Sequence, residues 1–160
     1  MRNGIPILVA GLMALAAPSQ AMAKNVVADP QIISKVMQDA GYRAEIAKLG
    51  NGEPYIQSAS GGYPFRLFFY GCDDDFENCL TVQLFAGFRT DESPTLEEMN
   101  AYSRDNRWAR VYIDAEDDPV IEMDIDLEDG GMSPELFTDN LEYWEYVMGQ
   151  FAEFAISQDQ

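Results

Sequence analysis

The sequence predicts an α+β protein, an antiparallel sheet with helices packed on it, in the element order α-β-β-β-β-α-β-β-α. Three observations support this class. Residues 42–88 and 108–128 alternate apolar and polar side chains around turn signals, as hairpin strands do. Segments starting at Pro30, Thr95 and Pro134 carry helix-capping residues and then repeat apolar residues every three or four positions. No linker or internal repeat divides the chain, so a single domain is expected.

The first helix and the first hairpin follow from local signals. Asp29 and Pro30 form an N-cap and a first-turn proline, and Gly41 ends the helix. The apolar residues of this segment share one helical face: Ile32, Ile33, Val36, Met37 and Ala40. Residues 42–49 and 54–58 are then expected to pair as strands around Asn51-Gly52, a strong hairpin turn.

The next hairpin has a register that two signals predict independently. Apolar residues alternate on both strands and are expected to point inward: Phe65, Leu67 and Phe69 on one, and Leu80, Val82, Leu84, Ala86 and Phe88 on the other. Antiparallel pairing places them opposite one another: Phe69 with Val82, Leu67 with Leu84, and Phe65 with Ala86. The same register puts Cys72 opposite Cys79. In an oxidising compartment this pair is expected to form a structural disulfide. A redox-active pair is the alternative, but the cysteines lack the close spacing of a thioredoxin-like site.

The second half of the chain adds a helix, a hairpin and a long helix. Thr95 and Glu98 form a capping box for a helix that runs to about Asn106. Residues 108–114 and 121–128 are expected to pair around a turn at residues 117–119, with these partners: Val111 and Ile125, Ile113 and Met123, Arg110 and Asp126. Ser133 and Pro134 begin the last helix, whose broad apolar stripe should cover the sheet.

Residues 1–23 resemble a secretion signal. Arg2 supplies the positive start, residues 5–17 are apolar, and Ala21-Met22-Ala23 is a small-x-small cleavage site. The apolar stretch is too short to span a bilayer, and no comparable stretch follows it. We therefore expect a periplasmic mature domain of residues 24–160 that does not insert into the membrane. An uncleaved N-terminal anchor is the alternative.

Composition excludes several classes of function. The chain has a net charge of −18, which becomes −19 once the signal with its one charge is removed. Such an excess of carboxylates repels nucleic acids and anionic lipid surfaces. Disorder is not the explanation, because 47% of the residues are hydrophobic. The chain contains no histidine, the commonest general base and zinc ligand. No catalytic residue, metal ligand or cofactor is therefore assigned.

A candidate partner-binding surface follows from the register of the central hairpin. That register turns Arg66, Phe68 and Tyr70 to the opposite face of the sheet, beside Phe85. Three aromatic side chains are more than an ordinary solvated sheet face carries. Either another part of the chain covers them, such as the strands of residues 42–58 or a helix, or they bind a partner or a second copy.

Rows of carboxylates provide two alternative functions. Two of Glu122, Asp124 and Asp126 would suit a carboxylate-dependent hydrolase, although a regular row that continues to Glu128 on a strand face is more simply a solvated surface. A calcium-responsive protein would need a loop starting at Asp124, but the glycine required at its sixth position is absent. The acidic cluster between the cysteines lacks that glycine as well: Asp73, Asp74, Asp75 and Glu77.

The mature chain resembles the YbjN-like family of small bacterial proteins described as sensory transduction regulators. The resemblance rests on the order and spacing of several segments: Gly41-Tyr42, residues 69–72, 106–114 and 119–127, and Gly130-Gly131 before the helix that reaches Gln150-Phe151. It implies a fold like that of type III secretion chaperones, which are acidic, commonly dimeric and bind segments of partner proteins. We therefore expect an exported, non-enzymatic binding or chaperone-like protein, a homodimer, with a protein or peptide partner.

Overall fold

The computed structural model describes residues 24–157, so the predicted secretion signal lies outside the described residues. The helices and strands follow the predicted order and form an α+β fold. The three helices are α1 (Pro30–Asp39), α2 (Leu96–Asp105) and α3 (Pro134–Ile156). The six strands are β1 (Glu45–Lys48), β2 (Pro54–Ser60), β3 (Tyr63–Tyr70), β4 (Thr81–Gly87), β5 (Arg110–Ile113) and β6 (Pro119–Asp126).

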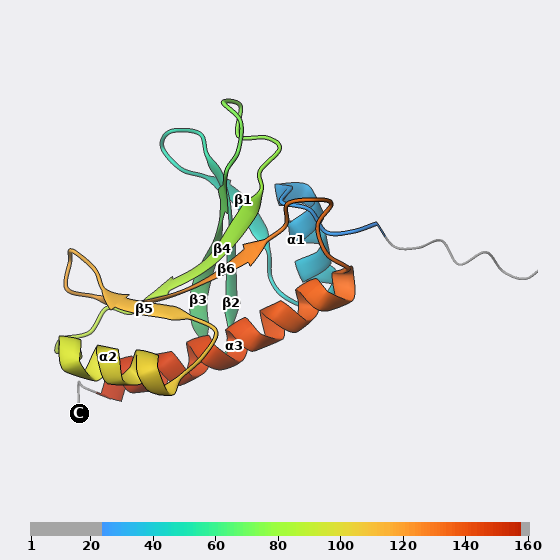
Figure 1. Ribbon diagram of the computed structural model, residues 1–160. Helices are drawn as coiled ribbons and strands as arrows, with labels where there is room; N and C mark the ends of the chain where they lie inside the picture. The colour runs from blue at the N-terminus through green and yellow to red at the C-terminus, as the bar shows by residue number, and fades with distance from the viewer. Residues whose placement is uncertain (1–23, 158–160) are drawn as a thin grey trace, which may run out of the picture.

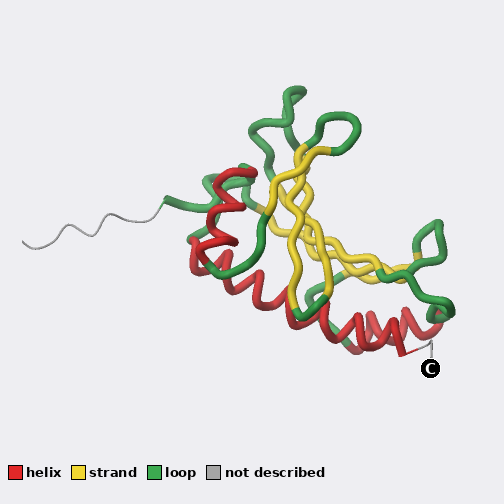
Figure 2. The backbone as a smooth tube through the Cα atoms, turned by 180° about the vertical axis from the view of Figure 1, so that it is seen from behind, coloured by secondary structure: helices red, strands yellow, loops and turns green. Residues whose placement is uncertain are grey.

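All six strands belong to one antiparallel sheet with the order β1-β2-β3-β4-β6-β5. The sheet is strongly twisted, and the three helices lie on one side of it in the two opposite views of Figures 1 and 2. No helix of the described chain crosses the other side, which we call the open face. None of the helices within residues 24–157 is both long and apolar enough to cross a membrane.

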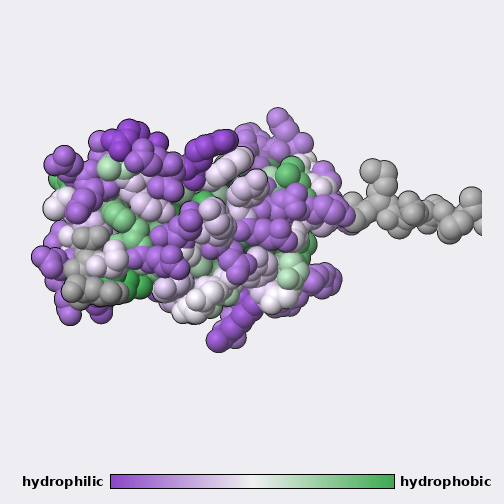
Figure 3. All heavy atoms as spheres, turned by 90° about the horizontal axis from the view of Figure 1, so that it is seen from below, coloured by the Kyte–Doolittle hydropathy of each residue, from purple (hydrophilic) through white to green (hydrophobic). Residues whose placement is uncertain are grey.

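The hydrophobic core lies between the sheet and α3. Apolar side chains of the central strands point toward this helix, and Phe65 makes an edge contact with the buried Trp144, with ring centroids 5.8 Å apart. The outer side of α2 and α3 is largely hydrophilic, with scattered apolar groups (Figure 3). Burying the α3 stripe against the sheet stabilises the fold, at roughly 25 cal/mol per Å² of apolar surface.

The predicted helix caps are confirmed. Asp29 accepts hydrogen bonds from the backbone N–H groups of Gln31 and Ile32 at the start of α1. Thr95 and Glu98 form the reciprocal capping box of α2. The first strand is shorter than predicted, because the Ala44 carbonyl accepts side-chain hydrogen bonds from α1 and the ladder begins only at Glu45.

The predicted register of the β3–β4 hairpin is confirmed. Leu67 lies opposite Leu84 and Phe69 opposite Val82. Cys72 and Cys79 form a disulfide at the mouth of the hairpin. Leu80 departs from the prediction: it precedes β4, stays 40% exposed and does not point into the core.

The predicted register of the second hairpin is wrong by four residues. Arg110 lies opposite Glu122 and not opposite Asp126, while Val111 pairs with Ile121 and not with Ile125. The turn lies two residues earlier than predicted, because the Asp114 carboxylate accepts hydrogen bonds from the N–H groups of residues 116 and 118. These bonds close the loop before Pro119, so β6 starts two residues earlier than expected.

Candidate functional site

The open face is built from alternate residues of neighbouring strands. The ladder places Tyr55 of β2 beside Phe68 of β3, and it places Arg66 beside Phe85 of β4. Phe85 in turn lies opposite Glu122 of β6, which pairs with Arg110 of the edge strand β5. Other side chains of this face follow from the same registers: Gln57, Tyr70, Thr81, Gln83, Tyr112, Asp124 and Asp126.

Three aromatic rings form a continuous row across the open face. Tyr55 stacks on Phe68 with ring centroids 5.8 Å apart, and Phe68 meets Phe85 edge-on, also at 5.8 Å. The Arg66 guanidinium lies 5.7 Å from the centre of the Tyr55 ring. The rings are half-buried by one another and by their neighbours. The structure thus brings Arg66, Phe68 and Phe85 together, and it adds Tyr55, which the alternation of β2 would have revealed.

Tyr70 lies on the same face but at its edge, next to the polar residues of β4 and β6. Its side chain is 45% exposed, and its hydroxyl donates to Gln83 Oε1 at 3.2 Å. The Gln83 amide donates in turn to Asp124 Oδ1 at 2.9 Å. Partial burial raises the pKa of the Tyr70 phenol, and the nearby Glu122 carboxylate raises it further. Tyr70 is therefore a neutral hydrogen-bonding residue at ordinary pH.

Glu122 corrects the prediction that the carboxylates of this strand are all solvated. Its residue exposure is only 5%. Arg110 donates to Oε2, and the Tyr112 hydroxyl donates to Oε1 at 2.7 Å. Burial, followed by the hydrogen bond to Glu122, raises the pKa of Tyr112 to about 12. Because both carboxylate oxygens are engaged, Glu122 is poorly placed to serve a hydrolase as acid or base.

The other acidic residues proposed as ligands or catalysts lie on the surface. Asp124, Asp126 and Glu128 are exposed, as predicted. In the turn between the cysteines, Asp73 accepts hydrogen bonds from Asn78 and from the backbone of residues 75 and 77, and these bonds lower its pKa. Among residues 24–157, no three His, Cys, Asp or Glu side chains are grouped so as to hold a metal ion.

Exposed aromatic residues that the sequence did not indicate lie on the helix side, away from the open face. Trp108 is 54% exposed, adopts a positive φ of 80° and stacks on Tyr143 with centroids 4.9 Å apart. Tyr146 is 62% exposed. A left-handed backbone is rare for a bulky residue and has no signature in a hydropathy pattern. The exposed positions of these rings could therefore not be predicted from the sequence.

The family comparison covers nearly all of the described chain. The sequence profile of the YbjN family, described as "Putative bacterial sensory transduction regulator", matches residues 29–156. The chain belongs to the YbjN family. No curated protein matches the sequence. The family description names a regulatory role.

Proposed function

We propose that this YbjN-family chain is an exported, non-enzymatic regulatory protein that binds a basic protein or peptide segment on its open face. The observation that carries the proposal is the row formed by Tyr55, Phe68 and Phe85 on a sheet face that no described helix covers. An aromatic row of this kind is typical of the centre of a protein interface.

The chemistry of the row supports a binding role. Tyrosine and arginine are among the residues that most often dominate binding energy, and rings that already contact one another lose little conformational freedom on binding. The polar side chains next to the row have partners of their own: Tyr70 with Gln83, Gln83 with Asp124, and Glu122 with Arg110. A partner would therefore bury the row without leaving these groups unsatisfied.

Charge supports a basic partner. Asp124 and Asp126 lie exposed on the open face. The other charges of this face have partners: Glu45 is paired with Arg43, Arg110 with Glu122, and Arg66 lies over the Tyr55 ring. The whole chain carries 28 acidic residues against 10 basic ones. A field of this sign attracts cationic segments and accelerates their encounter with the protein.

Export rests on separate features. Residues 1–23 have the composition of a secretion signal, and Cys72 and Cys79 form a disulfide that an oxidising compartment such as the periplasm would maintain.

A homodimer that buries the aromatic row of two copies is the alternative use of the open face. Analytical ultracentrifugation separates the two uses, because only self-association depends on the concentration of this chain alone.

The test is affinity capture from a periplasmic extract, followed by calorimetric titration of each captured protein in purified form. The binding variant is Phe68→Ser with Phe85→Ser. Its matched control is Leu96→Ser with Leu136→Ser, two apolar residues that are 76% and 51% exposed and lie on helices α2 and α3. Wild type and control should retain the same protein, and the binding variant should lose it.

A fold control completes the experiment. Since Phe68 and Phe85 are only half-buried, the binding variant should keep the circular dichroism spectrum of the wild type. A folded variant that still binds with unchanged affinity would overturn the proposal. An unfolded variant would show that the rings act as core residues, and retention of wild-type protein only by itself would favour the homodimer.

A further inference from the structure

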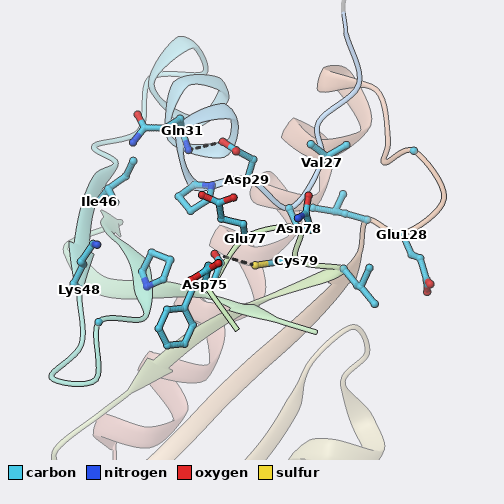
Figure 4. A pocket seen from close by; sticks show the side chains of 18 of the residues that line it. Val27, Asp29, Gln31, Ile46, Lys48, Asp75, Glu77, Asn78, Cys79 and Glu128 are labelled. Carbon is cyan, nitrogen blue, oxygen red and sulfur yellow. Dashed lines mark hydrogen bonds between the residues drawn. The ribbon is translucent and has the colours of Figure 1, made fainter. Parts of the chain in front are cut away.

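A pocket with a volume of about 800 Å³ lies at one end of the sheet, on the side of α1. Figure 4 shows four segments around it that are far apart in sequence. They are the start of α1, the β1–β2 hairpin, the disulfide-closed loop and the segment between β6 and α3. This volume falls within the range of pockets that hold small organic ligands.

Much of the pocket lining is apolar. Leu80, which leaves the core just before β4, is 40% exposed and faces this space. Phe76 and Ile46 are half-buried and line it as well. A ligand that filled the pocket would remove these surfaces from water, which favours a ligand with an aliphatic part.

The charged groups of the pocket are mostly carboxylates. Asp75 and Glu77 come from the disulfide-closed loop and Asp129 from the segment after β6, whereas Lys48 is the one basic residue of the lining. No ion pair with another described residue neutralises these three carboxylates. The pocket therefore presents an unbalanced negative charge next to apolar walls.

The helix end at the pocket does not reverse this preference. A helix N-terminus attracts anions through its free N–H groups. Here Asp29 Oδ1 already accepts from the N–H groups of Gln31 and Ile32, at 2.8 and 2.9 Å. The anion position at the start of α1 is thus filled by the protein, and the pocket favours a cation.

We infer that this pocket binds a linear aliphatic polyamine, whose ammonium groups meet Asp75, Glu77 and Asp129 while its methylene chain lies along Leu80 and Phe76. The inference is independent of the proposed function, because the pocket and the open face share none of the residues that carry either argument. Negative charge separated by apolar surface matches a ligand in which ammonium groups alternate with methylene segments.

The test is isothermal titration calorimetry of the mature chain with spermidine at low ionic strength. Asp75→Asn with Glu77→Gln removes two charges from the pocket. Asp139→Asn with Glu142→Gln, on the outer side of α3, makes the same change in net charge elsewhere. Wild type and the α3 control should bind one spermidine with equal affinity, and the pocket variant should bind about tenfold more weakly.

A second probe tests the apolar walls. Hexaamminecobalt(III) carries three positive charges, like spermidine, but has no methylene chain, so it should bind more weakly than spermidine. Equal affinity for the two probes would reduce the pocket to a diffuse counter-ion site and overturn the inference. An equal loss in both double variants, or no heat of binding from spermidine at millimolar concentration, would overturn it as well.

Discussion

Arg110 and Glu122 lie directly opposite each other in the β5–β6 ladder, and their exposures differ sharply. The Arg110 side chain is 64% exposed, whereas the Glu122 side chain is 6% exposed. The pair is therefore asymmetric: Oε2 of the buried carboxylate depends on the guanidinium for a partner, whereas the guanidinium has water available.

This asymmetry predicts unequal costs for the two single substitutions. Arg110→Met leaves the buried carboxylate with Tyr112 alone, and it should lower the free energy of unfolding by about 1–3 kcal/mol. Glu122→Gln still accepts from Tyr112 and releases Arg110 to solvent, so it should cost less than about 1 kcal/mol. Urea denaturation at neutral pH measures both. A larger loss of unfolding free energy for Glu122→Gln than for Arg110→Met would contradict the proposed dependence of the carboxylate on Arg110.

Tyrosine ionisation predicts a loss of stability in alkaline solution. Partial burial is the main cause that raises the pKa values of Tyr42, Tyr102 and Tyr112 from 10.0 to about 12. A raised pKa means that the folded state holds the phenolic proton more tightly than the unfolded state. The stabilisation is complete below pH 10 and is lost as the pH rises from 10 to about 12.

Melting temperatures measured from pH 8 upward test this window, whose limits are the pKa values given above. Tyr102→Phe keeps the ring contacts with Phe151 and Phe154 but removes the phenol, so it should flatten the decline. Tyr143→Phe, at a tyrosine that is 48% exposed and keeps its ring contact with Trp108, is the control and should follow the wild type. An unchanged slope in Tyr102→Phe would show that its phenol does not couple to folding.

The two hairpins show how far sequence patterns determine register. In the β3–β4 hairpin, the apolar alternation and the two cysteines agree on one pairing, and the structure confirms it. In the β5–β6 hairpin, a shift by four residues keeps every apolar residue on the same face. Arg110 meets an acidic residue in either register, Asp126 or Glu122. Neither pattern nor charge separates the two registers, and only the loop after Asp114 decides between them.

The sites differ in the same way. The aromatic row could be predicted largely from the sequence, because strand alternation assigns Phe68 and Phe85 to one face once the register is known. The pocket at the end of the sheet could not, since its walls come from four segments that no local motif connects. Leu80 illustrates this, because alternation placed it in the core and the structure places it in the pocket lining.

The disulfide predicts a measurable share of the stability. Cys72 and Cys79 close a short loop. Because their bond lowers the entropy of the unfolded chain, it raises the free energy of unfolding by about 2.5 kcal/mol. Cys72→Ser with Cys79→Ser should lower the free energy of unfolding by that order. A reducing agent should lower the melting temperature of the wild type and leave the double variant unchanged. No effect of reductant on the wild type would mean that the bond contributes nothing to stability.

Two adjacent glycines before α3 offer a prediction with an internal control. At Gly131, where φ is +73°, a Cβ atom would overlap the carbonyl oxygen of Val26. That carbonyl is held in place, because it accepts a hydrogen bond from the Met132 N–H at 3.1 Å. Gly131→Ala should therefore separate the N-terminal segment from the start of α3 and lower the free energy of unfolding by about 3 kcal/mol or more.

Gly130→Ala separates this overlap from the cost of the backbone conformation. Gly130 also has a positive φ, +98°, but a Cβ there would meet no atom within 4 Å. Its substitution should cost only about 1–2 kcal/mol, the penalty of a left-handed alanine. Urea denaturation of both variants gives the difference. Equal losses would mean that Val26 moves aside freely, so that its bridge to Met132 does not fix the N-terminal segment against the rest of the domain.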